Sequence, residues 1–308
     1  MNLNVRCAPC APYQPVRPGQ ARRLPCFVTG PRESGLASPS RFPSNRPVSY
    51  FSAILLGVIE GLTEFLPVSS TGHLLIAEHW LPRQTQLFNV VIQSGAMLAV
   101  LAVFWRRALE LLTHWRRPEA RDYLLKLAAA FLLTALGGVA LKKFGFKLPK
   151  EIAPVAWATL IGGFLILGIE RFLRGKPGAE QLSWAVAVVA AGAQVLAAAC
   201  PGASRSGATI LFAMLAGLGR ERATEFSFLL GLPTMFAAGG LETLQALNSA
   251  GTEEIHWDLI AVGTLASAAT AFVVVKWLLR FVQTHTFVVF GWYRIALGAL
   301  LLALPRTA

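Results

Sequence analysis

The sequence predicts an all-α integral membrane protein with six full transmembrane helices and two re-entrant helical hairpins in an inverted-topology repeat. Three observations lead to this fold class. The chain of 308 residues is 55% hydrophobic and only 14% charged, whereas roughly a quarter of the residues in soluble domains are charged. Its apolar runs are long enough to cross a bilayer, and their order along the chain repeats once. This composition excludes an ordinary soluble enzyme and a disordered or fibrous chain.

Residues 1–49 are expected to be a disordered basic tail rich in Pro and Arg, or a mis-assigned start upstream of the true one. Nine of the eighteen prolines lie here, and the segment lacks the apolar stretch of a signal peptide. Such a composition cannot bury a core. Cys7 and Cys10 have C-x-x-C spacing, but no second pair or nearby histidine would complete a zinc site. Residues 50–305 are expected to form a single membrane domain, with repeat halves of about 50–176 and 182–305.

Eight apolar regions follow the tail. A helix needs ~20 residues to cross a hydrocarbon core of ~30 Å, and six runs meet this length: 86–105, 123–143, 152–173, 225–246, 258–281 and 286–304. The other two regions, 51–81 and 184–218, are interrupted by the polar segments PVSSTG (67–72) and PGASRSG (201–207). Their arms are too short to span, so each region is expected to form a re-entrant hairpin surrounded by protein or water.

The order is a hairpin and three spans, followed by a hairpin and three spans. Because a hairpin returns to its own side and three is odd, the second half starts from the opposite side of the bilayer. Matching residues support the repeat at offsets of 134 and 135: Glu60 with Gln194, Pro67 with Pro201, Ser69 with Ser204, Thr71 with Ser206, and Gly72 with Gly207. The two polar turns are therefore expected to meet near the midplane.

The formal net charge of +12 does not indicate nucleic-acid binding, because the Lys and Arg residues lie mostly at the ends of apolar runs. One set of loops holds most of them: Arg106, Arg107, Arg116, Arg117, Arg121, Arg171, Arg174, Lys176, Arg220, Arg222, Lys276 and Arg280. The opposite set holds fewer: Arg83, Lys142, Lys143, Lys147, Lys150 and Arg306. The first set is expected to be cytoplasmic, which places the mouth of the first hairpin outside. The seven tail arginines would then lie on the wrong side.

Two carboxylates stand out in the first hairpin. Glu60 and Glu64 are four residues apart, so a helix projects them from one face. A charge at membrane depth costs several kcal/mol unless it is paired or solvated, and two neighbouring carboxylates repel each other. A divalent cation or a cationic partner between the two carboxylates would offset both the cost of burial and their repulsion. The alternative is a solvated pair near the interface.

The turn that follows carries three hydroxyl groups and a histidine. Ser69, Ser70 and Thr71 open the returning helix, whose N-terminus is a natural phosphate site, although Ser and Thr are also ordinary N-caps. His73 lies within the first helical turn. A lone histidine is often structural, but among hydroxyls and carboxylates it is a candidate acid, base or phosphate partner.

The second hairpin supplies a cation. Arg205 lies in an apolar region at another helix start, beside Ser204, Ser206 and Gly207, and arginine is suited to bidentate phosphate binding. The alternative is a structural salt bridge to Glu60 or Glu64. Supporting residues are expected around the site: Gln93, Gln194, Glu225 and Ser227.

Other charged positions receive lesser roles. Glu225 is expected to neutralise Arg205 or Arg222. Arg294, in the last span, is expected to be a snorkelling anchor. The remaining histidines lie toward span ends or loops and receive no functional role: His79, His114, His256 and His285.

Two acids, several hydroxyls, a histidine and an arginine on two facing turns suit cleavage of a phosphate or pyrophosphate on a membrane-resident substrate. The alternative is a transporter, such as a polyprenyl-phosphate flippase, because broken helices in inverted repeats are a transporter architecture. The fold cannot separate the two. The acids and the histidine favour hydrolysis.

The segment EGLTEFLPVSSTGH (60–73) resembles the first motif of the undecaprenyl-pyrophosphate phosphatases, the bacitracin-resistance protein family, and PGASRSGATI (201–210) resembles their second motif. The likeness extends over residues 50–304. It implies hydrolysis of undecaprenyl pyrophosphate to the monophosphate, which recycles the lipid carrier of cell-wall synthesis and confers bacitracin resistance. It also implies a divalent cation (Mg or Ca) and a bacterial inner-membrane protein whose site faces the periplasm.

Carried onto this chain, the family's functional residues are Glu60, Glu64, Ser70, His73 and Arg205, with Glu60 and Glu64 as the metal ligands. Ser69, Thr71, Ser204, Ser206 and Gly207 are expected to bind phosphate. The attacking group stays open among Ser70, His73 and water. A homodimer is compatible with these expectations.

Overall fold

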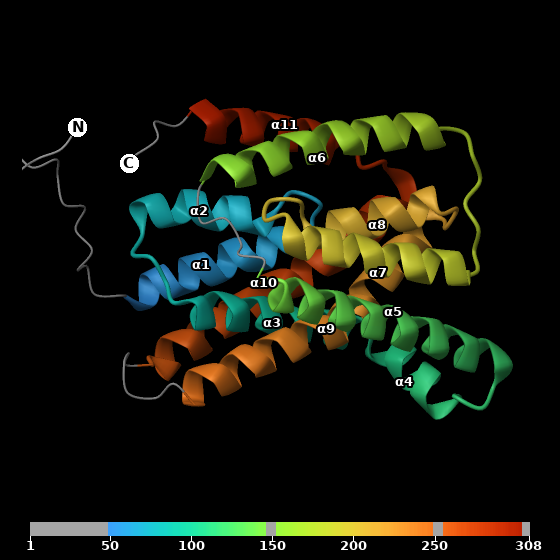
Figure 1. The fold of residues 1–308 in the computed structure, drawn as a ribbon, viewed down its shortest axis with the longest axis horizontal. Helices are drawn as coiled ribbons and strands as arrows, with labels where there is room; N and C mark the ends of the chain where they lie inside the picture. Colours follow the sequence, from blue (N-terminus) through green and yellow to red (C-terminus); the bar gives the residue numbers. More distant parts are fainter. Residues whose placement is uncertain (1–48, 146–151, 249–254, 304–308) are drawn as a thin grey trace, which may run out of the picture. The chain divides into compact units, whose positions relative to one another are not determined.

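The computed structural model describes residues 49–145, 152–248 and 255–303, and in these ranges it is built from helices (Figure 1). The first half contains α1 (Tyr50–Thr63), α2 (Ser70–Trp80), α3 (Gln86–Val103), α4 (Trp105–Thr113), α5 (Pro118–Lys143) and α6 (Ile152–Leu173). The second contains α7 (Trp184–Ala199), α8 (Arg205–Leu215), α9 (Arg220–Asn248), α10 (Trp257–Thr284) and α11 (Val288–Ala303). The tail 1–48 and residues 304–305 of the predicted domain lie outside the described residues.

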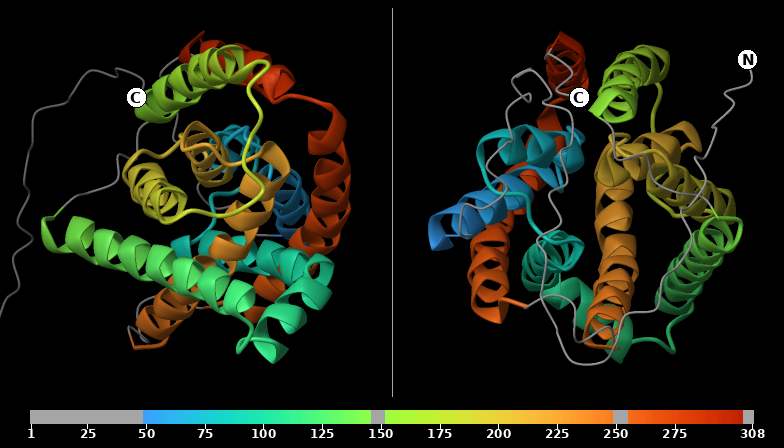
Figure 2. Two further views of the ribbon diagram at one scale, coloured as in Figure 1. Left: turned by 90° about the vertical axis from the view of Figure 1, so that its right-hand side faces the viewer. Right: turned by 60° about the vertical axis from the view of Figure 1, so that its left-hand side comes forward.

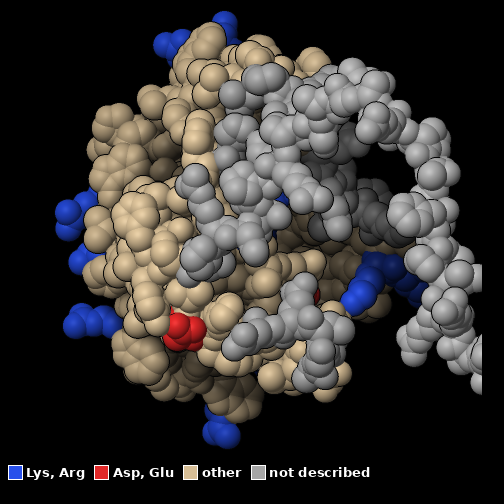
Figure 3. Space-filling model, turned by 90° about the vertical axis from the view of Figure 1, so that its left-hand side faces the viewer, with Lys and Arg blue, Asp and Glu red and all other residues tan. Residues whose placement is uncertain are grey.

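Five helices of the described chain are long and apolar enough to cross a membrane: α3, α5, α6, α9 and α10. The sixth predicted span corresponds to α11, which has 16 residues and reaches only about 24 Å at ~1.5 Å per residue. Large hydrophobic side chains lie exposed on these helices, including Leu136 (66%) and Leu265 (68%), and the face in Figure 3 is largely uncharged where it is described. The all-α membrane class is confirmed.

The predicted span 86–105 ends early because α4 follows α3 as a separate short helix. Its sequence, WRRALELLT, places Trp105, Leu109 and Leu112 on one exposed face and arginines beside them. This pattern is typical of a helix that lies along a membrane interface rather than across it. The sequence reasoning missed α4 because its apolar residues are too few to register as a span.

Both predicted hairpins are present, and their turns have the same local geometry. Ser69 (φ 72°) and Ser204 (φ 66°) are the two non-glycine residues with positive φ in the described chain. Each caps the following helix by accepting a hydrogen bond from the N–H group three residues later, Gly72 after Ser69 and Gly207 after Ser204. Non-glycine residues rarely adopt positive φ, so this shared conformation supports the matching of the two halves at an offset of 135.

Small residues let the helices approach closely around these turns. A Cβ atom on Gly57 of α1 would lie 2.3 Å from the carbonyl oxygen of Gly263 on α10. A Cβ atom on Gly163 of α6 would lie 2.8 Å from the carbonyl oxygen of Gly291 on α11, and these two helices lie side by side in both views of Figure 2. Close backbone packing through glycine is typical of membrane helices. It fixes α1, which carries Glu60, against α10.

The two turns touch each other. A Cβ atom on Gly207 would lie 3.0 Å from Cβ of Pro67, and the Ser206 hydroxyl donates to the backbone oxygen of Glu64 at 3.0 Å. Phe65, in the first turn, packs edge-on against Phe228 of α9 with ring centroids 5.1 Å apart. The expectation that the two turns meet is confirmed, and residues about 140 positions apart share one buried region.

Candidate active site

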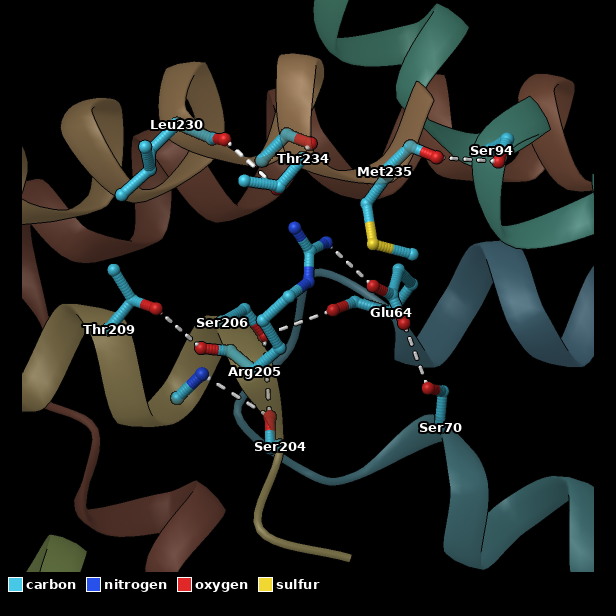
Figure 4. Close-up of polar contacts among 12 residues, drawn as sticks. Glu64, Ser70, Ser94, Ser204, Arg205, Ser206, Thr209, Leu230, Thr234 and Met235 are labelled. Carbon is cyan, nitrogen blue, oxygen red and sulfur yellow. Dashed lines mark hydrogen bonds and ion pairs between the residues drawn. The ribbon is translucent and has the colours of Figure 1, made fainter. Parts of the chain in front are cut away.

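Glu64 joins the two hairpins (Figure 4). Its Oε1 atom lies 2.7 Å from Nη2 of Arg205, and its Oε2 atom accepts a hydrogen bond from the Ser70 hydroxyl at 2.8 Å. The Glu64 side chain is only 8% exposed. A charge-assisted contact of this kind is among the stronger polar interactions in proteins. Glu64, Ser70 and Arg205 thus form one polar cluster, which we call the hairpin cluster.

The structural salt bridge considered as an alternative role for Arg205 is therefore present. It does not use all the donors of the guanidinium group, because the Nε atom is buried and has no hydrogen-bond partner among the described residues. On its other side the group faces α9, where a Cβ atom on Gly231 would lie 2.8 Å from Nη1. Glycine at this position leaves room for the arginine. Arg205 is thus neutralised by Glu64 and still has an unpaired donor.

Glu60 lies one helical turn before Glu64 and is completely buried. Neither carboxylate oxygen makes a hydrogen bond of ordinary geometry with another described residue, and the group with which Glu60 interacts most directly within the protein is the carboxyl group of Glu64. A solvated interfacial pair is excluded, because both carboxylates are buried. A buried carboxylate without a partner is expensive, so the position points to a ligand.

A divalent cation fits this donor set. Unpaired carboxylate oxygens are the ligands that hard cations prefer, and Mg²⁺ typically takes one or two carboxylates together with phosphate oxygens and waters. No group of three or more His, Cys, Asp or Glu that could hold a metal occurs in the part of the chain that the structure describes. The chain itself would therefore supply Glu60, with Glu64 beside it, and substrate and water would complete the coordination.

His73 lies close by but has other partners. Its Nδ1 atom lies 2.8 Å from the backbone oxygen of Ser69, and its Nε2 atom lies 2.6 Å from the hydroxyl of Tyr293 on α11. Because a carbonyl oxygen only accepts, Nδ1 carries the hydrogen, and in the neutral ring Nε2 accepts from the tyrosine. The hydrogen bonds of His73 therefore lead away from the hairpin cluster.

The hydroxyl groups expected to bind phosphate mostly bond to backbone. Ser69 and Ser204 are the N-caps of α2 and α8, and Ser206 donates to the backbone oxygens of Glu64 and Leu66. The Thr71 side chain makes no hydrogen bond to another described residue. Gly207 donates its N–H to the Ser204 hydroxyl. The Ser206 contacts join the two turns, and the Ser69 and Ser204 contacts cap their own helices. Among these hydroxyl groups, that of Thr71 is the one without a partner in the described chain.

None of the expected supporting residues makes a side-chain hydrogen bond or ion pair with the described residues of the hairpin cluster. Glu225 contacts Arg107 at 3.2 Å and Arg222 at 3.1 Å, so its expected pairing with Arg222 is confirmed and that with Arg205 is not found. Gln194, the counterpart of Glu60, is buried, and neither polar atom of its amide has a partner within the described ranges. No side-chain hydrogen bond joins Gln93 or Ser227 to Glu64, Ser70 or Arg205.

Arg294 corrects the sequence interpretation. It is 1% exposed and is not a snorkelling anchor: it donates to five backbone oxygens, at distances of 2.9 to 3.3 Å. These oxygens belong to both turns and to α6: Pro67, Gly202, Ala203, Ala158 and Thr159. Gly162 provides the space, because a Cβ atom there would lie 2.1 Å from Nη2 of Arg294. The sequence feature that could have predicted this role is an arginine in the middle of an apolar run, because charged residues within membrane segments face the interior of the helix bundle.

Comparison with known proteins covers this whole region. The family model described as bacitracin resistance protein BacA matches residues 53–300. An undecaprenyl-diphosphatase of Rhizobium etli is 49% identical over 261 residues, which are 84% of this chain and 98% of the relative. A protein with the same name from Xylella fastidiosa is 48% identical over 253 residues, which are 82% of this chain and 97% of the relative. Another from Xanthomonas oryzae pv. oryzae is 49% identical over 259 residues, which are 83% of this chain and 98% of the relative. Both polar turns and α11 up to residue 300 lie inside the family match.

Proposed function

This chain belongs to the family of the bacitracin resistance protein BacA, and from that premise we propose that it hydrolyses undecaprenyl diphosphate to undecaprenyl phosphate and inorganic phosphate. It is a membrane-embedded phosphatase, and its product is the lipid carrier of cell-wall synthesis. The observation that supports this reading best is the hairpin cluster, where Arg205 meets Glu64 beside the unpaired Glu60. The diphosphate supplies the anionic oxygens that Arg205 Nε lacks.

The residues suit attack on the terminal phosphorus. A nucleophile bonds to that phosphorus, the bond to the bridging oxygen breaks, and undecaprenyl phosphate leaves with the electron pair. Negative charge spreads over the phosphoryl oxygens in such a transition state. The free N–H groups of Arg205 and the N-termini of α2 and α8 would stabilise it.

Among the three candidate nucleophiles, the described contacts favour Ser70. Its hydroxyl donates to Glu64 at 2.8 Å, which is the arrangement of a nucleophile and its base. Glu64 would take the proton as the serine oxygen attacks, and water would then release phosphate from the serine. Both ring nitrogens of His73 have partners within the protein, so we propose that His73 shapes the phosphate site beside Ser70 and is not the attacking group.

We propose Glu60 and Glu64 as the ligands of a divalent cation, Mg or Ca. When bound, the ion would neutralise charge on the diphosphate and orient it. The support is the unpaired, buried carboxylate of Glu60. Glu64 would remain the link to Arg205 and Ser70.

The protein is a multi-pass membrane protein, and we propose the bacterial inner membrane with the site open to the periplasm. The support is the excess of Lys and Arg in the loops on the side of α4, which is typical of the cytoplasmic face.

The test is release of inorganic phosphate from undecaprenyl diphosphate by purified protein in detergent, with and without a chelator. Micelles have no compartments, so phosphate release reports hydrolysis and not transport. We expect the wild type to be active, the chelator to inhibit, and Glu64→Gln to lose at least about 100-fold in rate. Glu225→Gln is the matched control, because it removes a carboxylate whose ion pairs lie elsewhere. An inactive wild type, or an active Glu64→Gln variant, would exclude the proposal.

A further inference from the structure

The imidazole ring of His73 is held by two hydrogen bonds. The Ser69 backbone oxygen accepts from Nδ1, and the Tyr293 hydroxyl contacts Nε2 at 2.6 Å. The planes of the two rings are nearly parallel, with centroids 5.7 Å apart and an interplanar angle of 2°, so the rings lie edge to edge across this hydrogen bond. The partners come from opposite ends of the chain, since His73 and Tyr293 are 220 residues apart. Local structure at α2 provides the contact with Ser69, and α11 provides the contact with Tyr293.

The position of Tyr293 on α11 is itself fixed. The next residue, Arg294, donates five hydrogen bonds to α6 and to both turns, which sets the rotation and height of α11. Tyr293 is 46% exposed, so its ring is not held by burial. Arg294 fixes the stretch of α11 from which Tyr293 projects, and the hydrogen bond with His73 holds its hydroxyl group.

On the basis of the proposed function, we propose that Tyr293 is a positioning residue for His73, holding the imidazole ring in one orientation and one tautomer beside the phosphatase site. The nitrogen of a histidine that carries the proton is set by the hydrogen bond that the other nitrogen makes. Tyr293 donates to Nε2 and thereby reinforces the Nδ1–H form that the Ser69 oxygen selects. A third group that orients an imidazole is a recurring device in hydrolytic sites.

The proposal separates Tyr293 from the groups that bind substrate. Its effect passes through His73, so loss of the hydroxyl should lower kcat and leave KM nearly unchanged. A hydrogen bond of this kind contributes about tenfold in rate when it orients a working group. If Tyr293 supported only the packing of α11, the loss would be independent of His73.

The experiment compares Tyr293→Phe, which keeps the aromatic ring and removes the hydroxyl group, with Tyr50→Phe. Tyr50 is a matched control, because its hydroxyl also donates at 2.6 Å, to Asp258 away from the hairpin cluster. We expect kcat for undecaprenyl diphosphate to fall about tenfold in Tyr293→Phe, with KM within about twofold, and to stay unchanged in Tyr50→Phe. In a His73→Gln background, Tyr293→Phe should cause no further loss. An unchanged kcat, or the same loss in both backgrounds, would overturn the proposal.

A second measurement does not depend on activity. In protein labelled with ¹⁵N-histidine, the signals of His73 are identified by their absence in His73→Gln, since the chain has 5 histidines. We expect the Nδ1–H form in the wild type and in Tyr50→Phe, and a shifted signal of the unprotonated Nε2 in Tyr293→Phe, because Nε2 loses its hydrogen-bond donor there. Identical spectra in all three would refute the inference even if the protein were inactive. If the wild type hydrolyses the substrate normally and Tyr293→Phe has the same kcat and the same spectrum, the inference is refuted and the proposed function is not affected.

Discussion

At the scale of single residues, two arginines in apolar surroundings have different tasks. Arg205 pairs with a carboxylate and keeps an unpaired Nε donor, which suits a ligand. Arg294 donates hydrogen bonds to five backbone oxygens, and so it holds the two turns and α6 together as a clamp. The turn residues have no other backbone partners at these oxygens, so the clamp replaces the hydrogen bonds that a broken helix lacks.

We expect Arg294→Gln to unfold at a lower temperature than the wild type and to lose activity, because several buried carbonyl oxygens would lose their donors. Arg294→Lys should be intermediate, since an ammonium group cannot reproduce the planar fork of donors. Thermal unfolding in detergent measures both variants.

Arg280→Gln is the control for the loss of a positive charge, because Arg280 is exposed on α10. An Arg294→Gln variant as stable as Arg280→Gln would show that the five hydrogen bonds do not hold the turns.

At the scale of the elements, glycine decides how near the hairpin arms come to their neighbours. α1 meets α10 at Gly57 and Gly61, where a Cβ atom would lie 2.3 Å from the oxygen of Gly263 and 2.4 Å from that of Ser267. Glu60 lies between these glycines. The close contact between α1 and α10 therefore helps to fix the position of Glu60.

We expect Gly57→Ala to push α1 away from α10, to displace Glu60 and to reduce both thermal stability and phosphate release. The new Cβ atom would clash with the backbone of Gly263, which cannot move aside as a flexible side chain can. Gly192→Ala in α7 is the matched control, because a Cβ atom there meets nothing within 4 Å, and alanine should stabilise the helix by about 0.5–1 kcal/mol. Equal stability and activity of the two variants would show that close packing of α1 does not position the site.

At the scale of the whole molecule, sequence and structure agree where the signal is composition or a long motif. Apolar length predicted the spans, the breaks at 67–72 and 201–207 predicted the hairpins, and the repeat predicted that the turns meet. The roles of Arg294 and Tyr293 could not be predicted, because they depend on contacts between α11 and residues more than 90 positions away. The helix α4 was missed because interfacial helices are short and mixed in polarity.

The orientation of the whole molecule gives a further prediction. On the side predicted to be cytoplasmic, Arg107 of α4 and Arg222 of α9 share Glu225. In a chain whose four cysteines are replaced by serine, a cysteine at Thr85 should react with a membrane-impermeant thiol reagent added to intact spheroplasts, and one at Thr113 only after permeabilisation. Both positions are exposed. The reverse pattern would place the site on the cytoplasmic side.

The central claim is that Glu64 and Arg205, 141 residues apart, form one catalytic unit across the two hairpins. Phosphate release from undecaprenyl diphosphate by Glu64→Gln, Arg205→Ala and the double variant tests this most directly, with correct folding checked by size exclusion and thermal unfolding. We expect each single variant to lose at least about 100-fold and the double variant to be little worse than either, because residues that act as a unit are strongly non-additive. Near-normal activity of a single variant, or losses that simply multiply in the double variant, would contradict a shared site.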